Sequence, residues 1–173
     1  MKKVALVILM AISSVVFAAD ATLEVGGVKN RVTQANGSIA RVNVSEGALI
    51  GGLQTETVST TSRNQGDVSY GFPELFGVKT SIGLGAVTQT GVRSHVVYLG
   101  NIGYTYNFND AFNAGVGVSY RNDLDKNILD KRAAGKFKFG YNLDKSTSLG
   151  ASYERAYGDE KTNTYALIGT RKF

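Results

Sequence analysis

His95 is the only histidine of the 173-residue chain, and it directly follows Arg93 and Ser94. A serine, a histidine and a carboxylate that are held together form a hydrolytic site, in which the imidazole takes the proton of the hydroxyl. Such a site needs all three groups in fixed positions, and no motif here supplies the acid. We therefore interpret His95 as a histidine in a solvated loop or at a strand start, and we expect no catalytic residue.

Carboxylates offer a second kind of site. Asp123, Asp125 and Asp130 lie in the polar stretch RNDLDKNILDK (121–131), and their oxygens could hold a divalent cation. A solvated loop tip is the simpler interpretation of this stretch. With one histidine and no cysteine in the chain, the other carboxylates are scattered, so we expect no metal and no cofactor.

Fixed charges form a third group, and they alternate with Gly, Ser, Asn and Thr along strand-like segments. The antiparallel hairpin around Lys145 places Glu154 opposite or one step from Lys136 and Lys138, within reach of a cross-strand ion pair. The charges either form a structural network that fills a narrow interior or form a constriction that selects solutes. The candidates are Arg41, Glu56, Lys79, Arg121, Lys136, Lys138 and Glu154.

The elements that carry these charges are predicted to be strands. From Phe112 to Tyr120, apolar or aromatic residues occupy the even positions and Asn, Gly or Ser the odd ones, which is the period of a strand. We expect ten strands, or eight if the weak hairpin around NVSEGAL (43–49) is a loop. Short turns are expected at one end of the sheet and longer loops, such as TTSRNQG (60–66), at the other. The expected strands are 21–32, 38–45, 48–59, 64–72, 76–88, 95–108, 112–122, 132–143, 148–157 and 163–173.

The first 18 residues resemble an export signal. Lys2 and Lys3 precede an apolar run that is too short for a membrane span, and small residues follow it. We expect cleavage after Ala18, with an uncleaved anchor as the alternative, which leaves residues 19–173 as a single domain. The net charge of +5 is scattered along the chain, so nucleic acid is not an expected partner.

Alternation alone does not say which face of the sheet is dry, because a soluble sandwich and a membrane barrel both bury one side of every strand. The strand length of about nine to eleven residues matches a tilted membrane crossing. Aromatic residues at strand ends suit the two interfaces of a bilayer. They are Tyr70, Phe72, Phe76, Tyr106, Phe108, Phe112 and Tyr141 near the short turns, and Tyr98, Tyr120 and Tyr157 toward the loops.

The signal segment, the tyrosine-rich hairpins and the ending TYALIGTRKF (164–173) resemble Gram-negative outer-membrane β-barrel proteins of the porin and small-barrel type. The resemblance implies an all-β, transmembrane, antiparallel up-and-down barrel in the outer membrane, in contact with its lipid and lipopolysaccharide. It further implies that the barrel assembly machinery reads the last strand, through Tyr165, Leu167, Gly169 and Phe173. Arg171 departs from the pattern, which has an aromatic or apolar residue there more often.

Three functions are compatible with such a barrel. The first is a small porin-like channel for passive diffusion of hydrophilic solutes, with anions favoured if the basic residues set the field. The second is a closed structural or adhesin-like barrel that presents its loops to partners. The third is a barrel enzyme that acts on lipid, with His95 as its base. A charge at Val116 is expected to block assembly, whereas one at Gly117 is expected to be tolerated or to alter conductance. The sequence does not predict an oligomeric state.

Overall fold

Ten antiparallel strands form the computed structural model, which describes residues 20–125 and 130–173. The predicted signal peptide, 1–18, lies outside the described residues. No helix in these two ranges is long and apolar enough to cross a membrane. The strands are β1 (Asp20–Asn30), β2 (Asn36–Glu46), β3 (Leu49–Val58), β4 (Thr61–Gly71), β5 (Val78–Gln89), β6 (Val92–Asn107), β7 (Phe112–Asp123), β8 (Arg132–Asn142), β9 (Thr147–Gly158) and β10 (Thr162–Lys172).

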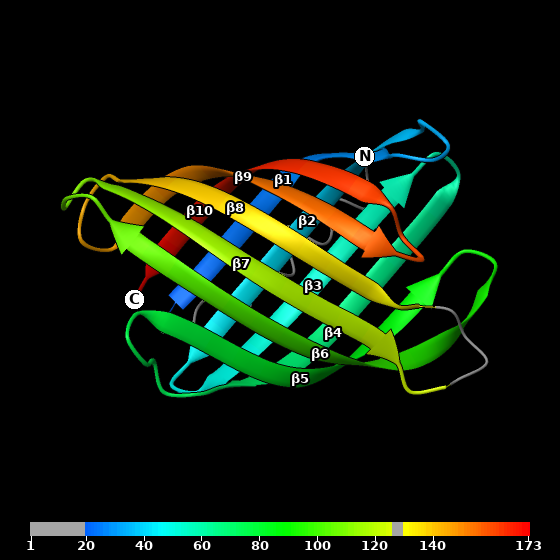
Figure 1. The fold of residues 1–173 in the computed structure, drawn as a ribbon, viewed down its shortest axis with the longest axis horizontal. Coiled ribbons are helices and arrows are strands. Elements are labelled where there is room, and N and C mark those ends of the chain that lie inside the picture. The colour runs from blue at the N-terminus through cyan, green and yellow to red at the C-terminus, as the bar shows by residue number, and fades with distance from the viewer. Residues whose placement is uncertain (1–19, 126–129) are drawn as a thin grey trace.

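The sheet closes on itself into a barrel (Figure 1). Each strand pairs with its neighbours in sequence, and β1 pairs with β10 from Asp20 opposite Lys172 to Asn30 opposite Thr162. The closed barrel therefore has no open edge, which is the requirement for strands that cross lipid. The expectation of a ten-stranded up-and-down barrel is confirmed.

The weak hairpin that separated ten strands from eight is formed. β2 and β3 pair up to Glu46 opposite Leu49, so the turn between them contains only Gly47 and Ala48. Gly47 has φ +57°, a left-handed conformation that glycine adopts at little cost. A two-residue turn with positive φ matches the twist of the flanking strands, and this turn keeps the register of the first third of the chain.

The expected difference in length between the connections at the two ends is wrong. TTSRNQG belongs mostly to β4, because Ser59, with φ +54°, already reverses the chain between β3 and β4. We call the end at which β1 begins and β10 ends the terminal end, and the other the loop end. Connections at the terminal end are 47–48, 72–77, 108–111 and 143–146, and those at the loop end are 31–35, 59–60, 90–91, 124–131 and 159–161.

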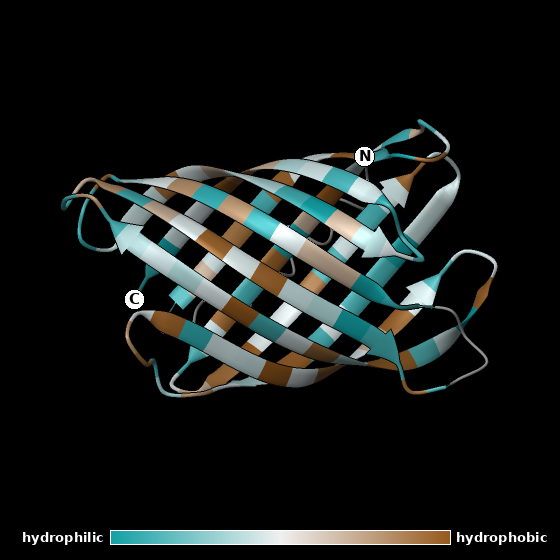
Figure 2. Ribbon diagram, viewed as in Figure 1, coloured by the Kyte–Doolittle hydropathy of each residue, from teal (hydrophilic) through white to brown (hydrophobic). Residues whose placement is uncertain are grey.

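The outer surface carries the large apolar side chains of every second position. Figure 2 shows hydrophobic and hydrophilic residues alternating along the strands. Val116 and Val118 are 56% and 59% exposed. Tyr104 and Phe137, the cross-strand neighbours of Val116, are exposed as well. A surface this apolar needs lipid around it, because soluble monomers rarely expose contiguous patches beyond a few hundred Å².

Aromatic residues gather near both ends of the barrel. At the terminal end the rings of Phe112 and Tyr141 lie 5.0 Å apart, and those of Tyr106 and Phe108 lie 5.1 Å apart. Toward the loop end Tyr98 contacts Tyr120 at 6.0 Å. Rings with an apolar body and a polar tip suit the two membrane interfaces, so the aromatic positions predicted from sequence mark the height of the apolar band.

We expect Val116→Lys to prevent or weaken barrel folding, because a lysine on the lipid face costs about 2–4 kcal/mol near the bilayer midplane and less toward the interfaces. Folding into lipid vesicles, followed by the mobility difference between boiled and unboiled samples on a gel, measures this effect.

Thr105→Lys is the matched control, because Thr105 faces the interior and is exposed there. It should fold like the unmodified chain. Gly117 is a poorer control than the sequence indicated, because a Cβ there would lie 3.2 Å from the carbonyl oxygen of Ile102. Equal folding yields for Val116→Lys and Thr105→Lys would contradict the assignment of the lipid face.

Candidate functional site

The interior of the barrel differs between its two halves, as the inward positions of β6 show. Toward the loop end His95 and Val97 are buried, with Val97 at 0% exposure. Toward the terminal end Asn101 and Thr105 are exposed, and the Asn101 amide donates a hydrogen bond of 3.2 Å to the Ser81 hydroxyl. The lumen is therefore polar and open toward the terminal end, and filled by side chains toward the loop end.

The first charged cluster lies at mid-height, and we call it the middle cluster: Glu24, Arg41, Arg132, Lys136 and Glu154. Arg41 donates to both carboxylate oxygens of Glu154, at 2.7 and 3.0 Å. Arg132 also pairs with Glu154, and the Lys136 ammonium lies 2.6 Å from a Glu24 oxygen. Bidentate contacts between arginine and carboxylate fix orientation as well as charge, so β1, β2, β8 and β9 are tied together across the lumen.

The second cluster lies toward the loop end, and we call it the loop-end cluster: Arg63, Arg121, Asp130 and Glu160. Arg63 pairs with both Asp130 and Glu160. Arg121 Nη2 lies 2.8 Å from Asp130 Oδ1 and 3.1 Å from Glu160 Oε2. Arg63 is on β4, whereas Glu160 lies in the β9–β10 connection, so their ion pair crosses the interior between distant parts of the wall.

The two clusters are connected through Arg132. Its guanidinium pairs with Glu154 of the middle cluster and lies 3.5 Å from Glu160 of the loop-end cluster. Alternating positive and negative side chains thus continue from mid-height to the loop end. Removing one partner of a buried pair leaves an unpaired buried charge, which costs more than the pair contributed.

The loop carboxylates are ionised because of the arginines beside them. Burial would raise the pKa of Asp130, but Arg121 and Arg63 hold that pKa below its ordinary value. Burial likewise opposes ionisation of Glu160, yet the guanidiniums of Arg121, Arg63 and Arg132 lower the pKa of its carboxyl. Both groups are therefore negative at neutral pH and hold the arginines in the lumen.

The structure distributes the seven residues expected to line the lumen over both halves. Arg41, Glu56, Arg121 and Glu154 are buried in the interior, and a Gln54 amide donates to Glu56 at 3.3 Å. Their role in solute passage stays a prediction.

The three lysines predicted to line the lumen differ in their ion-pair partners and exposure. Lys136 pairs in register with Glu154, but its nearest carboxylate is Glu24 of β1, at 2.6 Å against 4.0 Å for Glu154. Lys138 lies opposite Ser152 on the exposed inner face, where no ion pair with a described residue holds it. The Lys79 side chain is 73% exposed near the terminal end, 3.6 Å from Glu74.

Sequence reasoning missed several members of the clusters. Glu24, Arg63 and Arg132 lie on inward faces of β1, β4 and β8, so strand periodicity could have found them. Asp130 and Glu160 lie in connections, where periodicity carries no information.

The solvated-loop interpretation of His95 is wrong, and so is that of two of the three aspartates. His95 is on β6 with its side chain 2% exposed, and the side chains of Asp123 and Asp130 are 1% and 5% exposed. Asp130, just before β8, contacts Arg63 and Arg121, which supply the opposite charge. Asp123, the last residue of β7, lies 3.3 Å from His95 Nε2. Asp125 is the most exposed of the three aspartates and pairs with Arg93 at 2.6 Å.

The last strand presents its apolar side chains outward. Tyr165 and Leu167 are 58% and 73% exposed, Gly169 lies on the same face, and Phe173 is 64% exposed. The Arg171 guanidinium lies 5.4 Å from the centroid of the Phe173 ring. The charged side chain that departs from the apolar pattern therefore packs against an aromatic ring. Recognition of this strand by the assembly machinery stays a prediction.

Comparison with known proteins gives the fold. No protein-family model and no curated protein sequence matches the chain. The KdgM porin is similar in structure, with a TM-score of 0.55 and 9% identity over 88% of this chain and 99% of that chain. A NanC porin structure has a TM-score of 0.53 and 12% identity over 87% of this chain and 100% of that chain. The translocator domain of the autotransporter NalP from Neisseria meningitidis has a TM-score of 0.50 and 8% identity over 99% of this chain and 95% of that chain.

Identities this low show the fold alone. Together with the closed barrel and its apolar outer band, they show that the chain has the fold of outer-membrane β-barrels of the porin and small-barrel type. The subfamily is not identified.

We expect Glu160→Gln to destabilise the barrel at neutral pH by about 1–3 kcal/mol, a value reduced for the partial exposure of Glu160. The pKa of Glu160 is lowered on folding, so its contribution is present above the unfolded pKa of about 4.3 and is lost as pH falls through the lower folded value. Urea unfolding of Glu160→Gln and of the unmodified protein from pH 8 to pH 3 measures the difference between their free energies of unfolding.

Glu74→Gln is the control, because the exposed Glu74–Lys79 pair at the other end should contribute little. A stability gap for Glu160→Gln that stays unchanged down to pH 3 would argue against an ionised Glu160.

Proposed function

We propose that the chain is a narrow, porin-like channel through which small hydrophilic solutes diffuse passively across the outer membrane. The observation that carries this proposal is the polar, exposed lumen of the terminal half, which leads to the charged clusters. Asn101, Thr105 and Lys138 lie on this exposed inner surface. A ten-stranded barrel is wider than an eight-stranded one, whose interior is just filled by side chains.

The orientation that fits this function places the terminal end in the periplasm and the loop end outside. β1 begins and β10 ends at the terminal end, and the last strand with its exposed Phe173 would then be available to the assembly machinery during insertion. In this orientation lipopolysaccharide would surround the loop-end half of the apolar band.

Anions are the solutes favoured by the lumen charges. Lys138 extends into the exposed half without an ion pair to a described residue, whereas Lys136 is held by Glu24 at 2.6 Å. A fixed positive charge beside the aqueous path raises the local anion concentration. Lys138 is therefore the residue through which we expect selectivity to be changed.

No hydrolytic role is proposed for His95. Its Nε2 lies 2.9 Å from an Asp130 oxygen and its Nδ1 lies 2.9 Å from the Arg93 carbonyl oxygen. Among the described residues neither ring nitrogen is hydrogen-bonded to a hydroxyl group, so this arrangement does not pair His95 with the Ser94 oxygen as a base.

In planar bilayers we expect stepwise conductance with a preference for anions, and we expect Lys138→Glu to shift the reversal potential toward cation preference. The control is Lys145→Glu, a charge change in the exposed turn after β8 and outside the lumen. Absence of conductance steps, or a reversal potential that Lys138→Glu leaves unchanged, would contradict the channel proposal.

A second candidate function, a closed structural barrel, is favoured by one observation: the Arg63–Glu160 ion pair crosses the interior. The two functions differ in what happens when both partners are removed. If the loop-end cluster is the constriction of a channel, Arg63→Ala with Glu160→Ala should increase the unit conductance, because Asp130 keeps Arg121 as a partner.

Single-channel recordings of this double variant beside the unmodified barrel test the choice. Silent bilayers for both proteins, each shown to be folded by gel mobility, would favour the closed barrel.

A further inference from the structure

His95, Asp123 and Asp130 bring three metal-ligating atoms together at the loop end. His95 Nε2 lies 2.9 Å from Asp130 Oδ2 and 3.3 Å from Asp123 Oδ2. All three ligand atoms lie within 4.8 Å of one another, and all three residues are buried. Ligands of a tetrahedral zinc ion, each about 2.0–2.1 Å from the metal, lie roughly 3.3 Å apart, so the two distances from His95 Nε2 are close to those of a metal site.

The protonation of the imidazole makes this arrangement unusual. Nδ1 of His95 lies 2.9 Å from the Arg93 carbonyl oxygen, which only accepts, so Nδ1 carries a proton. In the neutral ring Nε2 then presents a lone pair to two carboxylate oxygens. Three acceptors facing one another need a cation between them, and that cation is either a second proton on the ring or a metal ion.

Asp123 gives the independent observation. Its Oδ2 accepts no hydrogen bond among the described residues, although the side chain is 1% exposed and this oxygen points toward His95. Its other oxygen, Oδ1, accepts the backbone N–H of Asp125. A buried carboxylate oxygen without a donor is costly, and a metal ion would supply the missing partner.

We propose that His95 Nε2, Asp123 Oδ2 and Asp130 Oδ2 form a binding site for a divalent transition metal of the zinc class. The hydrogen bond from Nδ1 to the Arg93 carbonyl is the outer contact that orients metal-binding histidines and leaves Nε2 free to coordinate. One nitrogen and two carboxylate oxygens are ligands that zinc accepts, with a fourth position left for water.

The arginines around Asp130 are compatible with this role. Arg121 occupies Oδ1, and Arg63 occupies one of the two lone pairs of Oδ2. The remaining lone pair is on the side of His95, which lies 2.9 Å away. Glu160 takes part of the charge of both guanidiniums, which reduces their repulsion of a bound cation.

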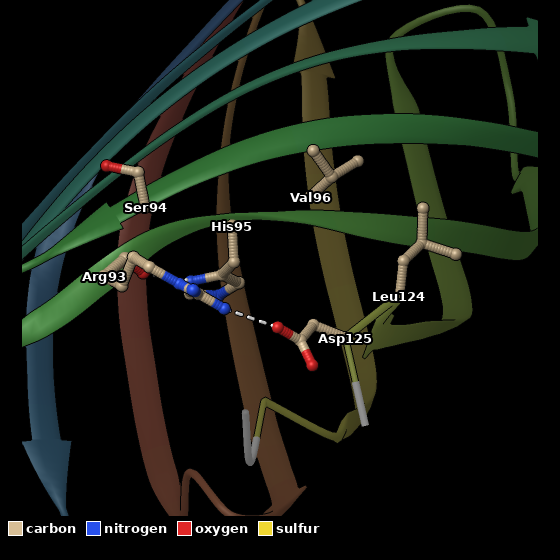
Figure 3. A pocket seen from close by; sticks show the side chains of 6 residues that line it. All are labelled: Arg93, Ser94, His95, Val96, Leu124 and Asp125. Carbon is tan, nitrogen blue, oxygen red and sulfur yellow. Dashed lines mark hydrogen bonds and ion pairs between the residues drawn. The ribbon is translucent and has the colours of Figure 1, made fainter. Parts of the chain in front are cut away.

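A pocket of about 380 Å³ borders the site at His95. It is lined by Arg93, Ser94, His95, Val96, Leu124 and Asp125. Figure 3 shows Arg93 and Asp125 paired beside His95, with the Asp125 carboxylate at the pocket. The metal would tie β6 to the end of β7 and to Asp130, and so would hold the loop end in its folded arrangement.

Zinc titration of the folded barrel in detergent micelles, by isothermal titration calorimetry, tests the proposal. One zinc ion per chain is expected, and His95→Ala and Asp123→Asn should each lower the affinity at least ~10-fold. Asp110→Asn, which changes an exposed carboxylate at the terminal end, should leave it unchanged. Gel mobility shows that each variant is folded, and Asp123→Asn preserves side-chain size if His95→Ala does not fold.

The chain has one histidine, so the ¹⁵N signals of its imidazole report the site directly. Zinc should shift Nε2 and leave Nδ1 protonated. No zinc binding, binding that survives both substitutions, or an imidazole that keeps two protons with zinc present would overturn the metal site in favour of a protonated histidine between two carboxylates. Neither measurement depends on conductance, so the outcome is independent of the channel proposal.

Discussion

The hydrogen-bonded pairing of β1 with β10 is the constraint on which the rest of this structure depends. In a hydrocarbon layer no water satisfies the backbone groups of an open strand edge, so the sheet must close. Closure with antiparallel neighbours gives every strand one outer and one inner face. The outer face meets lipid and is mostly apolar, so the charged side chains that are buried lie in a narrow common interior.

The charged clusters follow from that crowding. A ten-stranded barrel is too narrow to hydrate several fixed charges fully, so arginines and carboxylates from different strands pair with one another. Arg41 with Glu154 and Arg63 with Glu160 connect parts of the wall that are not neighbours in the sheet. The same contacts that neutralise the charges also narrow the lumen.

The two halves of the lumen differ in openness and in charge. The terminal half is lined by small polar residues and Lys138, and it remains open to water. The loop-end half concentrates the buried charges, and the side of it formed by β6, β7 and Asp130 gathers His95 and two aspartates. A solute would pass from a permissive vestibule to a selective constriction, and a cation bound at His95 would act on the rim of that constriction.

The sequence by itself determined most of the strands and which residues share a face, because these are local consequences of a period of two. Strand length and the aromatic residues at strand ends, not the alternation, indicated that the apolar face is the outer one. The sequence also indicated which charges point inward, among them Arg41, Arg121 and Glu154. Only the tertiary structure decided their partners: strand register predicts Glu154 for Lys136, yet Glu24 lies closer to it, across the barrel closure. Asp130 and Glu160 lie in connections without periodicity, and His95 is buried against Asp123 at the end of β7 and Asp130 just before β8. Contacts across a closed lumen join residues far apart in sequence, so no local pattern encodes them.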